Sequence, residues 1–165
     1  MKVAAFFLAA ALSAQAPDVW APLRKFIGAW DGETNGQPGK GMSSREYRFV
    51  LGGKYIEVRN RSVYPPQPAN PKGETHEDWG MISFDKARKQ FVLRQFHVEG
   101  FVNQYAGGAD LRFESEMIEN IPIGYRARET YVFDGDDAFI ERFEMAAPGK
   151  EFAVYSEVRF RRRAR

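Results

Sequence analysis

A strand-like segment near the middle of the chain carries polar groups on a face that should be apolar. Between Phe91 and His97 every second side chain points the same way, so Phe91, Leu93, Gln95 and His97 share one face. A core-facing imidazole and amide need polar partners, because burying them without hydrogen bonds is costly. Either these groups satisfy each other inside a packed core, or they line a cavity that accepts a ligand.

A hairpin would place a carboxylate opposite this imidazole. If residues 85–89 form the connecting loop, the opposed pairs are Phe84 with Phe91, Ile82 with Leu93, Gly80 with Gln95, and Asp78 with His97. Opposed side chains have Cβ atoms ~4.5 to 5.5 Å apart, so we predict a hydrogen bond between Asp78 and His97 that favours the charged imidazole unless desolvation cancels this effect. Such a pair can bind an anion or a polar head group, move a proton, or simply close the barrel end as a structural pair.

A metal site is the weakest of the interpretations for this region. His76, Glu77, Asp78 and His97 resemble a ligand set in type. Adjacent residues of a strand point to opposite sides, however, and His76 falls in or beside a proline-rich loop, so no spacing imposes a common face. We therefore expect no metal ligand and no bound cofactor.

Two other strand-like segments carry charged groups of interest. Glu141 shares a face with Phe139, Phe143 and Met145 and is a second polar residue in an aromatic wall. Along residues 125–133 the alternation is clear, but it does not determine which of the two faces points inward. Arg126 and Arg128 therefore either face solvent or hold an acidic ligand group. Solvent is favoured, because unpaired charged residues are mostly exposed. The candidate ligand-binding residues are thus Asp78, Gln95, His97, Phe84, Phe91, Leu93, Glu141, Arg126 and Arg128.

These residues lie within a long series of strand signals. After a helical turn at residues 22–27, alternating runs occupy residues 29–34, 43–51, 54–64, 77–84, 90–97, 101–106, 110–117, 125–133, 138–145 and 151–161. Glycine-rich turns separate most of these runs. The exceptions are two longer loops at a barrel rim, residues 65–75 and 118–124. In the last run Phe152, Val154, Ser156, Val158 and Phe160 form one core-lining face. The sequence predicts an all-β fold: one antiparallel up-and-down β-barrel of about ten strands.

Composition and the residues at the chain ends indicate the compartment and the partners to expect for this barrel. Residues 1–16 follow the order of a secretory signal peptide, with cleavage after Ala14 or Ala16, and residues 17–165 form one domain. The chain has no cysteine, hence no disulfide and no lipid-modified cysteine as a membrane anchor. Its net charge of +2 gives no field for a nucleic-acid partner, and the arginines of 159–165 are expected to form a solvated tail. We expect a periplasmic or secreted monomer or homodimer.

The opening of the predicted domain resembles a known family. Pro22-Leu23 followed by Gly28-Ala29-Trp30-Asp31-Gly32 is similar to the start of lipocalin-like and nitrobindin-like (calycin) barrels, and the similarity continues through residues 52–55 and 80–85. The resemblance implies that Trp30 plugs a closed barrel end. The nitrobindin-like branch binds haem through a histidine near the last strands, and residues 151–165 contain none. The resemblance therefore implies a small exported bacterial branch that does not bind haem.

Binding is the function that the sequence favours. Phe84, Phe91, Ile82 and Leu93 would bury the apolar body of a small or amphipathic ligand, and Gln95 and His97 would hold its polar head group. The chain lacks a Gly-x-Ser-x-Gly motif, a cysteine nucleophile and a phosphate-binding glycine loop. The alternatives are an enzyme that uses Asp78 and His97 as an acid–base pair on an enclosed small substrate, and a haem-binding barrel.

Overall fold

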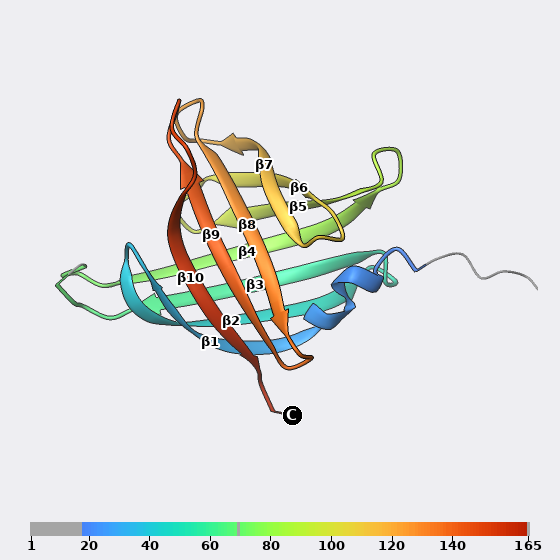
Figure 1. Cartoon of the computed structure of the whole chain (residues 1–165), viewed down its shortest axis with the longest axis horizontal. Helices are drawn as coiled ribbons and strands as arrows, with labels where there is room; N and C mark the ends of the chain where they lie inside the picture. Colours follow the sequence, from blue (N-terminus) through green and yellow to red (C-terminus); the bar gives the residue numbers. More distant parts are fainter. Residues whose placement is uncertain (1–17, 69, 165) are drawn as a thin grey trace, which may run out of the picture.

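Ten antiparallel strands follow one another around a closed barrel, as the sequence predicts (Figure 1). The structure is a computed structural model that describes residues 18–68 and 70–164. The expected signal peptide therefore lies outside the described residues. A 3₁₀ helix η1 (Ala21–Phe26) precedes β1 (Gly28–Gly36), β2 (Gly39–Val50), β3 (Tyr55–Tyr64), β4 (Glu74–Asp85), β5 (Gln90–His97), β6 (Val102–Gly107), β7 (Arg112–Glu119), β8 (Arg126–Asp134), β9 (Ala138–Ala146) and β10 (Ala153–Arg162).

The register of the central hairpin is the expected one. Strands β4 and β5 pair Phe84 with Phe91, Ile82 with Leu93, Gly80 with Gln95, and Asp78 with His97. Strand β4 begins earlier than expected, however, because Glu74, Thr75 and His76 pair with the end of β3. Their backbone groups thereby find partners that a loop would not supply. His76 therefore lies on a strand, two residues before Asp78 and on the same face.

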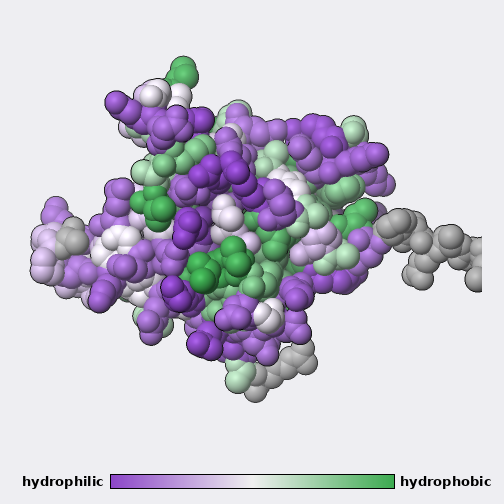
Figure 2. All heavy atoms as spheres, in the orientation of Figure 1, coloured by the Kyte–Doolittle hydropathy of each residue, from purple (hydrophilic) through white to green (hydrophobic). Residues whose placement is uncertain are grey.

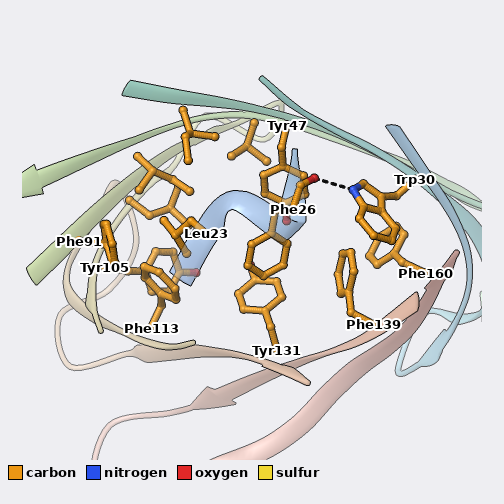
Figure 3. Close-up of a cluster of buried hydrophobic side chains, with 14 of the residues drawn as sticks. Leu23, Phe26, Trp30, Tyr47, Phe91, Tyr105, Phe113, Tyr131, Phe139 and Phe160 are labelled. Carbon is orange, nitrogen blue, oxygen red and sulfur yellow. Dashed lines mark hydrogen bonds between the residues drawn. The ribbon is translucent and has the colours of Figure 1, made fainter. Parts of the chain in front are cut away.

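Helix η1 fills one end of the barrel, where its Leu23 and Phe26 pack among aromatic side chains of the strands (Figure 3). Phe26 packs against Tyr47 and Phe139 at ring-centroid distances of 5.0 and 5.2 Å. Trp30 is fully buried at this end, where its Nε1–H donates to the Phe26 carbonyl over 2.7 Å. Only about 10 Å³ of free space remains beside Phe26, which leaves no room for a ligand. Trp30 thus belongs to the closed end, as the resemblance implies.

The last strand departs from its expected inward and outward pattern at its beginning. A bulge between Val154 and Ser156 inserts one residue into the strand. The side chains that precede the bulge therefore point to the face opposite to the expected one. Val154 is consequently 49% exposed, and Phe152 lies against the outer guanidinium of Arg128. Val158 and Phe160 remain buried, as expected.

The basic tail is more ordered than expected. Strand β10 extends to Arg162, whose guanidinium donates to the Ile27 carbonyl over 2.9 Å and lies 4.1 Å from the centre of the Trp30 ring system. Arg163 forms an ion pair with Asp31 of β1. A solvated tail is therefore the wrong description of these two arginines, because free carbonyls at the closed end and a carboxylate on β1 give them partners.

The outer surface is mostly hydrophilic on the face shown in Figure 2, with apolar side chains towards its middle. Trp79 and Phe96 pack against each other on the outside of β4 and β5, with ring centroids 5.6 Å apart. Arg94 is also outside, paired with Glu119. All three face outward as the alternation predicts. Within the described residues, no helix combines the length and apolar character needed to cross a membrane.

Candidate functional site

An internal cavity of about 380 Å³ separates the packed end of the barrel from its other end. This volume lies in the lower part of the range for small-molecule sites. A polar belt lies at mid-strand and consists of Arg45, Asn60, Asp78, Gln95, Asn103, Glu129 and Glu141. An apolar rim lies towards the hairpins opposite η1 and includes Tyr64, Phe101, Ile118, Ile121, Phe143, Met145 and Tyr155.

A second, larger hollow of about 760 Å³ lies on the outer face of strands β2 to β5. Its lining includes Arg59, Arg61, Glu77 and Trp79, and it is broadly open to solvent. A ligand there would keep most of its surface in water. The internal cavity, which can enclose a small molecule, is therefore the candidate site.

The belt is organised by one buried ion pair that crosses the barrel. Arg45 of β2 places Nη1 2.6 Å from Glu141 Oε2 of β9, and each side chain is only 6% exposed. This short approach joins the two charges directly inside the barrel. Burial acts to lower the pKa of Arg45, but the combined attraction of Glu141 and other acidic groups around it, Asp78 among them, outweighs burial and raises the pKa. Arg45 therefore remains charged inside the barrel.

A chain of hydrogen bonds leads from Arg45 along the wall of the cavity. Nε and Nη2 of Arg45 both donate to Asn60 Oδ1 over 3.2 Å, and Asn60 Nδ2 donates to Asp78 Oδ2 over 2.8 Å. Asp78 Oδ2 also lies 3.5 Å from His76 Nε2. Burial acts to raise the pKa of Asp78, but His76 and Arg45 lower it overall, so the carboxylate is ionised.

The expected hydrogen bond between Asp78 and His97 does not form. His76, on the same face of β4, lies against both residues, with its Nε2 3.4 Å from His97 Nδ1. His97 Nε2 lies 3.2 Å from Asn103 Nδ2, and the imidazole stacks on Phe101 with ring centroids 4.0 Å apart. The acid–base pair of the enzyme alternative is therefore replaced by a cluster of three residues.

The two histidines differ in charge. Burial lowers the pKa of His97 to about 4, against the opposing attraction of Asp78. For His76 burial also acts to lower the pKa, but hydrogen bonds to Asp78 and Glu99 raise it to about 9. The charged form of His97 is therefore not favoured: burial has the largest effect on its pKa, and His76, which takes the contact with the carboxylate, adds a positive charge nearby.

The opposite wall of the belt is acidic. Glu129 of β8 is 4% exposed and accepts a hydrogen bond from the Tyr131 hydroxyl. Burial, with repulsion from Glu141, raises the pKa of Glu129 to about 7. Burial also raises the pKa of Glu141, although Arg45 opposes this shift. The belt thus holds an acid that titrates near neutral pH.

Three buried acceptors of the belt have no donor within the described residues. They are Asp78 Oδ1, Gln95 Oε1 and Asn103 Oδ1, and each of these side chains is more than nine-tenths buried. A buried polar atom without a hydrogen bond costs roughly 1–3 kcal/mol. All three are acceptors, so this part of the cavity presents sites for donors.

The structure brings together only some of the residues expected to bind ligand. Asp78, Gln95, His97 and Glu141 line the cavity. Phe84, Phe91 and Leu93 do not, because Trp20 and η1 occupy their end of the barrel; Phe91 stacks on Trp20 at 5.6 Å. The sequence pattern could not show that a segment outside the strands fills this space.

Strand β8 turns its arginines outward, which settles the face that the sequence left open. Ala127, Glu129 and Tyr131 point inward. Arg128 donates two hydrogen bonds of 2.7 Å to Glu144, and Arg126 donates to the Lys150 carbonyl. Neither arginine lines the cavity, in agreement with the favoured solvent-facing orientation and not with a role in ligand binding.

Sequence reasoning missed several belt residues. Arg45, Asn60, Asn103 and Glu129 each occupy an inward position between apolar neighbours at i−2 or i+2, the same signal that identified Gln95. His76 was considered only as a metal ligand and was set aside, because the start of β4 was placed too late. The signal was therefore present, but the inward phase of each strand was needed to apply it.

The comparison with solved structures supports the fold. The barrel is similar to the crystal structure of Rv2717c from M. tuberculosis, with a TM-score of 0.66, 16% sequence identity, and coverage of 91% of this chain and 100% of that chain. At such identity the likeness shows the fold alone, a closed antiparallel β-barrel. No protein-family model matches the chain, and no curated protein matches it.

Proposed function

We propose that this barrel binds a small amphipathic molecule in its internal cavity, with a hydrogen-bond-donating, cationic head group on the polar belt. The unpaired acceptors Asp78 Oδ1 and Gln95 Oε1 carry the proposal. A ligand that donates hydrogen bonds to them removes the cost of their burial. A ligand that only accepts leaves them unpaired.

The charges around the cavity favour a cation. The lining carboxylates are those of Glu74, Asp78, Glu99, Glu129 and Glu141. Among the described lining residues, Arg45 and His76 supply the positive charge. The apolar rim then covers the body of the ligand, so the orientation is the reverse of the one expected from the sequence, in which the aromatic end was to hold the apolar body.

A matched pair of probes tests the head group. We expect n-octylammonium to bind chelator-treated, untagged protein at least ~10-fold more tightly than octanoate in isothermal titration calorimetry, which corresponds to about one hydrogen bond. The two probes share a chain length and differ in the head group. Equal or tighter binding of octanoate would contradict the proposal. Mass spectrometry of small molecules extracted from the purified protein would identify a ligand that co-purifies.

Two substitutions on the same face of β5 separate binding from stability. Gln95→Leu removes an unpaired acceptor, so we expect roughly tenfold weaker n-octylammonium binding with no loss of folding stability. Phe91→Leu leaves a void at the packed end, so we expect a loss of about 1–2 kcal/mol in unfolding free energy with unchanged affinity. Chemical denaturation and calorimetry measure both quantities. Parallel losses in the two variants would show that Gln95 only supports the fold.

We propose that the cavity does not bind haem through His97. His97 Nδ1 lies 3.4 Å from His76 Nε2, which leaves room for one ion shared by the two rings but not for a haem plane. His97 Nε2 lies against Asn103, and Phe101 covers one face of the ring. We expect protein mixed with haem to show no sharp Soret band that His97→Ala removes. A stoichiometric complex that is lost in His97→Ala would place the protein among haem-binding barrels after all.

We also propose that the domain is exported to the periplasm or the medium. Support comes from the order of charged, apolar and small residues in 1–16. Intact-mass measurement of the full chain expressed in a Gram-negative host should give a product that begins after Ala14 or Ala16. A product that keeps residues 1–16 would contradict export.

A further inference from the structure

We propose that His76, Asp78 and His97 form a binding site for one divalent transition-metal ion, with Zn²⁺ as the reference ion. His76 and Asp78 are two residues apart on β4 and share a face, and His97 is the register partner of Asp78 on β5. One ligand atom from each lies within 4.8 Å of the other two. The site does not depend on the amphipathic ligand proposed above.

The separations of the ligand atoms match a metal site. His76 Nε2 lies 3.5 Å from Asp78 Oδ2 and 3.4 Å from His97 Nδ1. Zinc bonds of ~2.0–2.1 Å at tetrahedral angles place neighbouring ligand atoms about 3.3 Å apart. A cation at the centre of these three atoms would therefore require only small side-chain movements.

Each ligand is held by a second contact, as metal-binding side chains usually are. His76 Nδ1 lies 2.8 Å from Glu99 Oε1, so the carboxylate can orient the imidazole and leave Nε2 for the ion. Asn60 donates to Asp78 Oδ2. The His97 ring is held by its stacking on Phe101.

A turn of the neighbouring Asn103 amide would give His97 the tautomer that a metal needs. Asn103 Nδ2 lies near both His97 Nε2 and the Tyr105 hydroxyl, whereas Asn103 Oδ1 is buried without a donor. A half-turn of this amide would let Oδ1 accept from both His97 Nε2–H and the Tyr105 hydroxyl. His97 Nδ1 would then carry a lone pair directed at the ion.

The donor set selects the class of ion. Two imidazoles and one carboxylate suit Zn²⁺, Co²⁺, Ni²⁺ or Fe²⁺, whereas Ca²⁺ and Mg²⁺ prefer oxygen ligands. Asp78 Oδ1, buried and unpaired, adds a second independent sign that a positive group belongs here. All three residues line the cavity, so a fourth coordination position is open to water or a ligand.

The chain contains only two histidines, so their imidazole signals give a direct test. Untagged ¹⁵N-labelled protein is first treated with chelator and then titrated with Zn²⁺ while ¹H–¹⁵N spectra of the rings are recorded. We expect both imidazoles to change together and to saturate at one equivalent. A response of His76 alone would instead favour the more exposed group of Glu74, His76 and Glu99 and would overturn the proposal.

Variants and Co²⁺ absorption complete the test. His97→Ala and Asp78→Asn should weaken Co²⁺ and Zn²⁺ binding by more than ~100-fold, and Glu99→Gln by ~10–100-fold, the usual effect of an orienting partner. Glu77→Gln is the matched control, because Glu77 lies between two ligands but faces outward to Arg61; its affinity should be unchanged. Failure of wild-type protein to bind one equivalent, or undiminished binding in folded His97→Ala, would refute the site. Zinc binding is measured in the absence of n-octylammonium, and n-octylammonium binding is measured on metal-free protein. Either proposal can therefore fail while the other holds.

Discussion

Arg45→Met should lower the free energy of unfolding by about 3–5 kcal/mol at pH 8. The substitution keeps the length of the side chain but leaves the Glu141 carboxylate buried without its counter-ion, and removing one partner of a buried ion pair is strongly destabilising. Asn60 Oδ1 also loses both of its donors. Urea denaturation followed by circular dichroism would measure the loss.

Two further variants identify the cause of that loss. Adding Glu141→Gln to Arg45→Met removes the unpaired charge and should restore a substantial part of the lost stability. Arg142→Ala breaks an exposed ion pair with Glu157 on the outside of the barrel and should cost no more than ~1 kcal/mol. A loss below ~1 kcal/mol for Arg45→Met would show that the pair crossing the barrel contributes little.

Glu129→Gln should stabilise the protein above pH 7, by roughly 3 kcal/mol at pH 8 and above. Burial raises the pKa of Glu129 from 4.5 to about 7, and each pH unit between these values is worth about 1.4 kcal/mol. The protonated acid favours the folded state, so its stabilisation is complete below about pH 4.5 and is lost as the pH rises through 7. Glutamine stays neutral and keeps an acceptor for the Tyr131 hydroxyl.

An outward glutamate on the neighbouring strand is the control for this pH dependence. A hydrogen-bonded ion pair with Arg128 lowers the pKa of Glu144, so its contribution is present above the unfolded-state pKa and is lost as the pH falls through the folded-state value. Glu144→Gln should therefore destabilise the protein at pH 8. Urea denaturation from pH 5 to 8 compares the two variants, and a gain for Glu129→Gln that does not grow with pH would contradict burial as its cause.

The strands and the central hairpin could be read from the sequence because both signals are local. A period of two residues marks each strand, and glycine-containing turns mark most of its ends. The loop at residues 85–89 was enough to fix the pairing of Asp78 with His97 and of Phe84 with Phe91. Gln95, His97, Asp78 and Glu141 were identified as inward polar residues by the same alternation, and all four line the cavity.

Barrel closure decided what local pattern could not. It brings Arg45 of β2 to Glu141 of β9, and it lets η1 fill the end where Phe91 was expected to meet a ligand. It also determines where strand pairing begins. Because β4 already pairs with β3 at His76, this residue lies on the strand and contacts both Asp78 and His97. Alternation shows that side chains share a face, but the partner across the interior depends on how the whole sheet closes, because those contacts join residues that no local spacing relates.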